Sequence, residues 1–237
     1  MRISLCLVTW NELQGCQIDV PQLPRDQFDE IYAVDGGSTD GTIAYLESQG
    51  IPVHVQPKKG LNAAYVHAND MSTCDHVVVF FPKATTPVTD LLKFRPLFAQ
   101  GNELVVASRQ IAGSVNEEDV SLWRPRKWAV WILSVLAMLV WKRDGYWVRD
   151  VLHGFKGWSR SAFQKMKVLD HGLSIDIEMV VRAYKLRIAR AEFPTSEVGR
   201  AYGTTHFKIW PTGKRPPAAR PTVTAGLRWQ PEMWPIA

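Results

Sequence analysis

A carboxylate, Asp35, ends the apolar stretch EIYAVD and begins the string DGGSTDGT at residues 35–42. Gly36 and Gly37 allow a tight turn, and residues 38–40 are of the types that cap the start of a helix. A carboxylate at the end of a strand in an α/β sheet faces the crevice where ligands bind. There it can accept hydrogen bonds from a nucleobase N–H or a ribose hydroxyl. The string therefore indicates a nucleotide site.

A cation follows another apolar run. Residues 76–81, HVVVFF, are followed directly by Pro82 and Lys83, and no carboxylate occurs before Asp90. Lys58 and Lys59 offer two more ammonium groups in a neighbouring loop. Lysine carries a compact positive charge that suits phosphate oxygens. The end of this strand is therefore expected to face an anionic group.

The elements that must position these residues are short apolar runs alternating with helical stretches. Strands are predicted at 3–8, 30–35, 51–55, 76–81 and 103–108, and helices at 41–49, 60–71 and 87–99. Strands that are almost wholly apolar and alternate with helices are typical of a mainly parallel sheet covered on both faces. The fold class is therefore predicted as α/β.

Residues 128–141, WAVWILSVLAMLVW, are apolar on every side except at Ser134. Fourteen residues are too few to span a bilayer, which takes about 20. Cations flank the stretch on both sides, and five of the ten tryptophans lie in or beside it. Such a segment is typical of a helix lying in a membrane interface, so residues 124–143 are predicted to contact a membrane peripherally. A buried core helix or a dimer contact would show the same pattern, so the oligomeric state stays open.

Composition and charge narrow the class of protein. With 46% hydrophobic and 22% charged residues, the 237-residue chain is globular and not disordered. The net charge of +5 lies in the proline-rich stretch 199–237, which suggests an anionic partner such as a nucleotide, a lipid phosphate or a membrane surface. The three cysteines are scattered, which favours a reducing, cytoplasmic compartment. Nucleic acid is disfavoured as a partner because the basic stretch has no recognition helix.

Together, VTWNE at 8–12 and VDGGSTDGT at 34–42 resemble the nucleotide-binding half of the family 2 glycosyltransferases, which have the GT-A fold. The second half resembles the polyprenyl-phosphate sugar transferases, the dolichyl-phosphate mannose synthase branch. The residues that carry this likeness are DVLHGFK at 150–156, IDIE at 175–178 and AEFPTSEVGRAYGTTHFK at 191–208. The likeness implies a GT-A domain over 1–208, with a nucleotide-binding half at 1–110 and an acceptor half at 111–208. Residues 209–237 would then form a basic, proline-rich tail.

The resemblance also implies roles for single residues. The base and ribose of a nucleotide sugar would be held by Thr9, Asn11, Glu12 and Asp35, with Gly37 and Lys59 beside them. Phosphates would be bound by Lys83, Arg109, Arg200 and Lys208, and guanidinium groups suit phosphate oxygens. The candidates for a catalytic carboxylate are Asp150, Asp176 and Glu178.

Two departures from the family pattern stand out. Most members carry a second acid where this chain has Gly36. More seriously, Phe81-Pro82-Lys83 occupies the place of the Asp-x-Asp motif that holds Mg²⁺ or Mn²⁺ against the diphosphate. Phenylalanine cannot ligate a metal, and Lys83 would repel one. We therefore expect no metal cofactor, with Lys83 and the arginines taking over the metal's charge.

The sequence thus predicts an inverting glycosyltransferase, metal-independent and peripheral on the cytoplasmic face of a membrane. It would move a sugar from a UDP- or GDP-linked donor to a membrane-associated acceptor, either a lipid phosphate or a glycan. A lipid phosphate needs no general base, whereas a sugar hydroxyl needs a carboxylate. A soluble saccharide is the alternative acceptor. The alternative from another class is a pseudo-glycosyltransferase that binds a nucleotide or partner without turnover.

Overall fold

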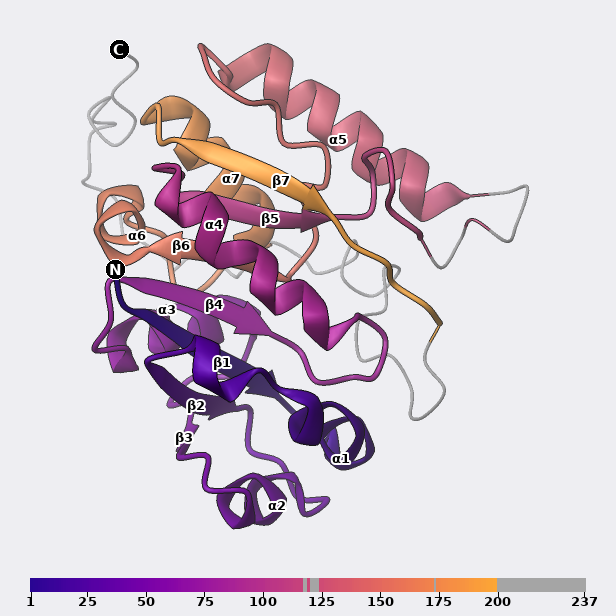
Figure 1. Cartoon of the computed structure of the whole chain (residues 1–237). Coiled ribbons are helices and arrows are strands. Elements are labelled where there is room, and N and C mark those ends of the chain that lie inside the picture. Colours follow the sequence, from indigo (N-terminus) through magenta and orange to yellow (C-terminus); the bar gives the residue numbers. More distant parts are fainter. Residues whose placement is uncertain (117–118, 120–123, 173, 200–237) are drawn as a thin grey trace, which may run out of the picture. The chain divides into compact units, whose positions relative to one another are not determined.

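A seven-stranded sheet forms the centre of the computed structural model, which describes residues 1–116, 119, 124–172 and 174–199 (Figure 1). The strand order is β3-β2-β1-β4-β6-β5-β7. The strands are β1 (Ile3–Thr9), β2 (Glu30–Asp35), β3 (Val53–Val55), β4 (His76–Phe80), β5 (Leu104–Ser108), β6 (Lys156–Ser159) and β7 (Arg190–Pro194).

Strand direction decides which residues meet. β1 pairs in parallel with β2, with Thr9 opposite Asp35, and in parallel with β4, with Leu7 opposite Phe80. β6 runs antiparallel between β4 and β5, and β5 pairs in parallel with β7. Every strand except β6 therefore ends at the same edge of the sheet, and β6 begins there.

Helices cover both faces of the sheet, and a hydrophobic cluster fills the space under each layer. One cluster joins Val77 and Val79 to α3, α5, α6 and α7, and the other joins Val78 and Phe80 to α1, α2 and α4. The α-helices are α1 (Leu13–Asp19), α2 (Thr42–Ser48), α3 (Leu61–Met71), α4 (Phe94–Ala99), α5 (Pro125–Trp141), α6 (Arg160–Met166) and α7 (Ile175–Lys185). Short 3-10 turns lie at η1 (Val20–Gln22), η2 (Arg25–Gln27) and η3 (Val88–Lys93).

These features confirm the predicted mainly parallel α/β sheet with helices on both faces. All five predicted strands exist, with ends that differ by no more than two residues. The helix predicted over 87–99 divides into η3 and α4. Two further strands, β6 and β7, were not predicted, because KGWS and RAEFP are short and carry charges.

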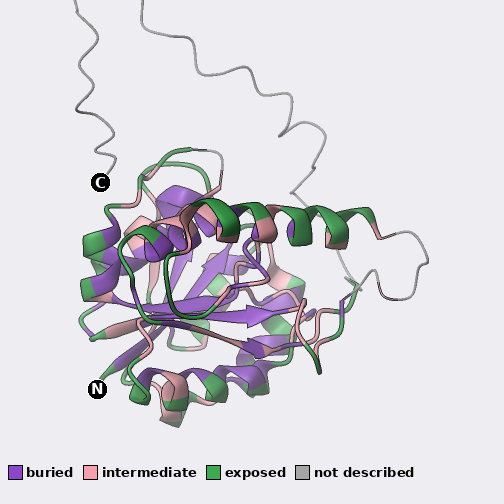
Figure 2. Ribbon diagram, turned by 90° about the horizontal axis from the view of Figure 1, so that it is seen from above, coloured by how far each residue is buried: buried purple, intermediate pink, exposed green. Residues whose placement is uncertain are grey.

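The apolar stretch 128–141 lies within α5, and its two sides have different surroundings. Val130, Ser134 and Ala137 are buried, whereas the opposite side of the helix is exposed. Figure 2 shows α5 along the outside of the structure with much of its length coloured as exposed. The interpretation as a wholly buried core helix is therefore wrong. Within the described ranges, no helix is long and apolar enough to cross a bilayer.

Some predictions fall outside the described residues. These are the phosphate-binding roles of Arg200 and Lys208 and the basic tail at 209–237.

Candidate active site

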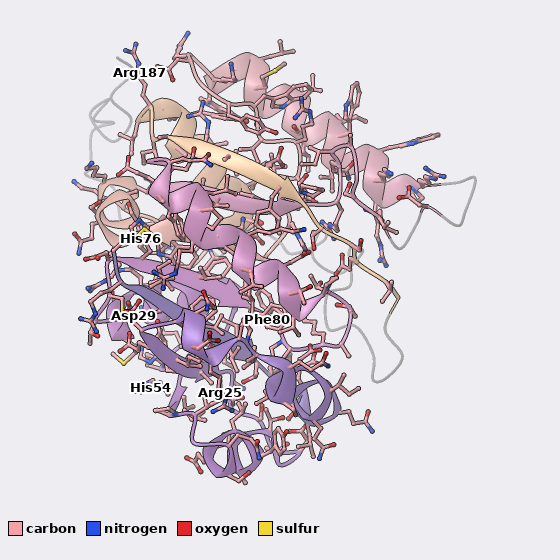
Figure 3. All side chains as sticks on the ribbon, in the orientation of Figure 1. Arg25, Asp29, His54, His76, Phe80 and Arg187 are labelled. Carbon is pink, nitrogen blue, oxygen red and sulfur yellow. The ribbon has the colours of Figure 1, made fainter. Side chains whose placement is uncertain are left out.

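The edge of the sheet where the parallel strands end collects most of the predicted site residues. In Figure 3 the labels His76 and Phe80 mark the first and last residues of β4, and the candidate site lies beyond Phe80. The same edge carries Thr9 at the end of β1, Asp35 at the end of β2 and Arg109 directly after β5. Ligand sites of open α/β sheets form at this edge, beside the strand where the chain order reverses. Here that strand is β1, which lies between β2 and β4.

Asp35 is fully buried and organises the first half of the site. Its Oδ2 accepts hydrogen bonds from Thr9 Oγ1 and Ser38 Oγ, both at 2.7 Å. Its Oδ1 accepts from the backbone amides of Gly37 at 2.8 Å and Ser38 at 2.6 Å. A carboxylate has about four acceptor positions, and all four are used here. Asp35 therefore joins the ends of β1 and β2 and fixes the turn that follows.

The loop after β1 is tied to the same turn. Asn11 has a left-handed backbone with φ of 50°. Its backbone amide donates to Ser38 Oγ at 2.8 Å, and its side-chain Oδ1 accepts from the Thr39 backbone amide at 2.9 Å. The Glu12 amide donates to Thr42 Oγ1 at 3.0 Å. These bonds hold Asn11 and Glu12 next to the turn after Asp35. Their predicted contact with a nucleotide remains a prediction.

Trp10 explains the missing second acid of the family pattern. A Cβ at Gly36 would lie 3.2 Å from Cβ and Cγ of Trp10, closer than most side chains tolerate. Glycine is the residue that allows this approach. Gly37 has a left-handed φ of 89° and an exposed backbone.

The loop before α3 carries Lys58 and Lys59, both exposed. Lys58 forms an ion pair with Asp170 in the loop between α6 and α7. This pair links the loop before α3 to the loop between α6 and α7. The role of Lys59 in nucleotide binding remains a prediction.

The segment Phe81-Pro82-Lys83 is packed against two glycines. A Cβ at Gly15 in α1 would lie 2.2 Å from the Pro82 carbonyl oxygen, and a Cβ at Gly154 would lie 2.7 Å from Phe81 Cε2. Only glycine permits backbone and ring to approach so closely. Lys83 Nζ lies 4.7 Å from the centre of the Phe81 ring, within the range of a cation–π contact.

A residue on α1 holds the backbone directly after Lys83. Asp19 is buried, and its Oδ2 accepts a hydrogen bond from the amide of Ala84, which has a left-handed φ of 54°. Burial raises the pKa of Asp19 to about 6, although the Ala84 hydrogen bond acts against this shift. No local pattern indicated this contact, because 65 residues separate its partners.

Arg109 lies at the centre of the second half of the site, bonded to two carboxylates. Its Nε donates to Asp150 Oδ2 at 2.8 Å and its Nη2 to Asp150 Oδ1 at 3.0 Å, while Nη1 donates to Glu197 Oε2 at 2.5 Å. Asp150 is fully buried. Burial by itself raises the pKa of Asp150, but the charge and hydrogen bonds of Arg109 outweigh it and lower this pKa to about 2. Asp150 is therefore ionised and serves as the counter-ion of Arg109.

Glu197 balances a second cation. Burial acts to raise its pKa, yet the charges of Arg109 and Lys83 contribute to a net lowering. Lys83 and Arg109 therefore both lie within electrostatic reach of the Glu197 carboxylate. Arg109 is thus paired with both carboxylates, and the Lys83 charge adds a weaker attraction on Glu197.

His153 and Glu192 complete this cluster, and neither was predicted from the sequence. His153 Nδ1 donates to the Ala107 carbonyl oxygen at 2.5 Å, and Glu192 accepts from the amides of Arg149 at 2.9 Å and Asp150 at 2.8 Å. Burial lowers the pKa of His153, and the Arg109 charge lowers it further, so the imidazole is neutral near pH 7. Burial raises the pKa of Glu192.

The other two candidate carboxylates lie on α7, and both are bonded to cations. Asp176 Oδ1 lies 2.8 Å from Lys156 Nζ, with both side chains buried, and accepts from Tyr65 Oη at 3.2 Å. Glu178 Oε1 accepts from Arg182 Nε at 2.7 Å, one turn further along the helix. The catalytic roles of Asp176 and Glu178 remain predictions, and these contacts give each a structural function.

The side chains at the position of the family's metal motif do not fit a divalent cation. Phe81 and Lys83 supply no oxygen ligand, and a hard cation needs several. The nearby carboxylates of Asp150 and Glu197 are both bonded to Arg109. Among the described residues, no three histidine, cysteine, aspartate or glutamate side chains form a group that could hold a metal.

The comparisons with known proteins agree with this fold. A sequence model of glycosyl transferase family 2 matches residues 6–167. Glycosyltransferase AglJ of Haloferax volcanii is 25% identical over 204 residues, which make up 85% of this chain and 65% of the relative. The chain thus spans just under two thirds of the length of this curated relative.

Solved structures share the fold at lower identity. A complex of glucosyl-3-phosphoglycerate synthase from Mycobacterium tuberculosis with Mn²⁺, UDP and glucosyl-3-phosphoglycerate has a TM-score of 0.62 and 16% identity, covering 86% of this chain and 73% of that chain. Another structure of that synthase has a TM-score of 0.61 and 20% identity, covering 84% and 73%. Because the family model matches more than half of the chain, this protein belongs to glycosyl transferase family 2, and its fold is the GT-A fold.

Proposed function

We propose that the protein transfers a sugar, with inversion, from a nucleotide diphosphate sugar to a lipid-linked phosphate at the cytoplasmic face of a membrane. The acceptor oxygen attacks the anomeric carbon in line, and the bond from that carbon to the nucleoside diphosphate breaks. The proposed reaction uses no divalent metal. UDP is the first nucleotide to test, because the synthase from Mycobacterium tuberculosis binds it, and GDP is the alternative.

The contacts of the three candidate catalytic carboxylates support a phosphate as the acceptor. Asp150 is bonded to Arg109, Asp176 to Lys156, and Glu178 to Arg182. The Arg109 charge lowers the pKa of Asp150 to about 2, so Asp150 is a poor acceptor for a further proton, and the carboxylates of Asp176 and Glu178 are engaged in ion pairs. A sugar hydroxyl needs such a base, whereas a phosphate oxygen is already ionised. A phosphate acceptor therefore fits these residues better than a soluble saccharide.

Lys83 and Arg109 support the metal-independent part of the proposal. Both lie at the edge where the donor's diphosphate is expected, and together they carry the charge that one divalent ion would supply. Glu197 now neutralises part of this charge. We therefore expect the diphosphate to displace Glu197 and take its place beside Arg109.

Calorimetric titration of UDP and GDP tests the role of Lys83. Wild type and Lys83→Ala would be compared in EDTA and in Mn²⁺, with Lys165→Ala as the control. Lys165 lies 3.9 Å from Glu103, at the opposite edge of the sheet, so its removal changes the net charge equally without touching the site. We expect wild type to bind the nucleotide in EDTA. Lys83→Ala should weaken this binding at least about tenfold, and Lys165→Ala should leave it unchanged. Binding that requires Mn²⁺ would overturn the metal-independent part.

The second candidate function, a pseudo-glycosyltransferase, is favoured by the phenylalanine and lysine in place of metal ligands. Incubation with labelled UDP- and GDP-sugars and a short-chain polyprenyl phosphate separates the two. Product that migrates as a lipid-linked sugar supports the proposal. Nucleotide binding without any product, with either this acceptor or soluble saccharides, would favour the second candidate.

A further inference from the structure

Helix α5 is fixed to the rest of the fold by one side only. Val130, Ser134 and Ala137 on that side are buried. Ser134 Oγ donates to the Val148 carbonyl oxygen at 2.8 Å and accepts from Trp147 Nε1 at 2.7 Å. A polar group at the centre of an apolar helix is therefore satisfied, and the orientation of α5 about its own axis is set by these contacts.

The other side of α5 exposes six large apolar side chains. Their exposed fractions are 51% for Trp128, 53% for Trp131, 51% for Ile132, 52% for Leu136, 70% for Leu139 and 54% for Val140. Spacings of three, four and seven residues place them on one face of the helix. We call this set the outer face of α5. Single exposed apolar residues are ordinary, but a contiguous apolar face of this kind marks an interaction surface.

Cations flank the outer face at both ends. Residues 124–143 contain five lysines and arginines, two of which, Arg124 and Lys127, form ion pairs with Asp119. Arg126 is exposed at the N-terminal end of α5, and Arg143 is exposed just beyond its C-terminal end. Indole rings and aliphatic side chains between cations match the interfacial layer of a bilayer, where apolar groups enter the acyl region and cations meet phosphates.

We propose that the outer face of α5 lies in the interfacial layer of an anionic membrane, with the helix axis parallel to the bilayer. Its N-terminal end borders the candidate site, since Gln110 Nε2 donates to the Lys127 carbonyl oxygen at 3.5 Å and Gln110 follows Arg109. Docking in this way would bring Arg109 close to the headgroups, where a lipid-linked phosphate is found. The inference deepens the proposed function and rests on it for the identity of the acceptor.

Charge favours a bilayer over a second copy of the chain. If two copies paired through their outer faces, the cations at the ends of one α5 would meet those of the other in either relative direction. Like charges brought together in this way oppose association. Anionic headgroups instead attract cations at both ends of the helix.

Vesicle sedimentation tests this docking. The full chain would be mixed with phosphatidylcholine vesicles, with and without phosphatidylglycerol. The double variant Leu136→Glu/Leu139→Glu places two charges in the outer face, and Leu92→Glu is the matched control because Leu92 is 46% exposed outside α5. We expect the protein to bind vesicles that contain phosphatidylglycerol, the double variant to bind at least about tenfold more weakly, and the control to bind like wild type.

Three outcomes would overturn the docking proposal. In the first, wild-type protein stays in the supernatant. In the second, the double variant binds vesicles as well as wild type does. In the third, light scattering shows a dimer for wild type and a monomer for the double variant. Thermal unfolding of the double variant checks that it is folded, since both replaced side chains are exposed. Titration of UDP into the same variant separates the two proposals. Unchanged UDP binding with lost vesicle binding supports docking through α5, and vesicle binding without any sugar transfer would overturn only the proposed function.

Discussion

Replacing Asp176 by asparagine is expected to destabilise the protein strongly, because it would leave a buried lysine without its counter-ion. Asp176 Oδ1 lies 2.8 Å from Lys156 Nζ; the Lys156 side chain is 0% exposed and that of Asp176 is 7% exposed. Removing one partner of a buried ion pair costs about 3–5 kcal/mol. In a domain of about 200 residues, each kcal/mol lowers Tm by roughly 2–4 °C. Asp176→Asn should therefore lower Tm by about 6–20 °C.

Thermal and urea unfolding of three variants would measure this effect. Lys156→Met/Asp176→Asn removes both charges with little change in volume, so it should recover most of the lost stability. Glu178→Gln is the control from the same helix. Its pair with Arg182 joins partly exposed residues four apart, and such pairs contribute only about 0.3–0.5 kcal/mol.

Activity decides between a structural and a catalytic Asp176. A double variant that is stable and still transfers sugar would show that no proton needs to reach Asp176. Wild-type stability of Asp176→Asn together with a large loss of kcat would refute the structural interpretation, and with it the argument that the acceptor is already ionised.

Two further predictions concern Arg109 and its partners. Glu197→Gln should raise the affinity for UDP in EDTA about fivefold, which corresponds to roughly 1 kcal/mol. The reason is that the diphosphate no longer displaces a like charge. Weaker binding of UDP by calorimetry would contradict this displacement. The pKa of Asp150 is lowered to about 2, below its value of about 4 in an unfolded chain. Its contribution of about 2.5 kcal/mol is therefore present above pH 4 and is lost as the pH falls toward 2. Urea unfolding between pH 5 and 2 should show this loss in wild type and a flatter dependence in Asp150→Asn.

Local patterns predicted the sheet well. The runs that became β1, β2 and β4 are almost wholly apolar, and DGGSTDGT carries its own turn and capping residues, so the placement of Asp35 at a strand end followed directly. β6 was missed because Lys156 interrupts its apolar pattern. The charge is tolerated in the sheet because Asp176 lies beside it, twenty residues further along the chain.

The contacts that define the site depend on distant parts of the chain. Arg109 was predicted to bind phosphate, but nothing near it in the sequence showed that Asp150 and Glu197 would hold it. Periodicity was equally uninformative for α5. Both of its sides are apolar, and the inner side is identified by the burial of Val130 and Ala137 and by the hydrogen bond of Ser134 to Val148.

The packing around Phe81-Pro82-Lys83 bears on how the chain could change over evolutionary time. Phe81 contributes to the core cluster and covers Gly154, while Pro82 is buried against Gly15. Exchanging Phe81 and Lys83 for aspartates would remove that ring, and truncating a packed phenylalanine costs about 3–5 kcal/mol. A variant of this chain with both aspartates would therefore be a less stable protein. Because Gly15 and Gly154 are packed closely against this segment, restoring the family's two carboxylates would require compensating changes elsewhere in the fold.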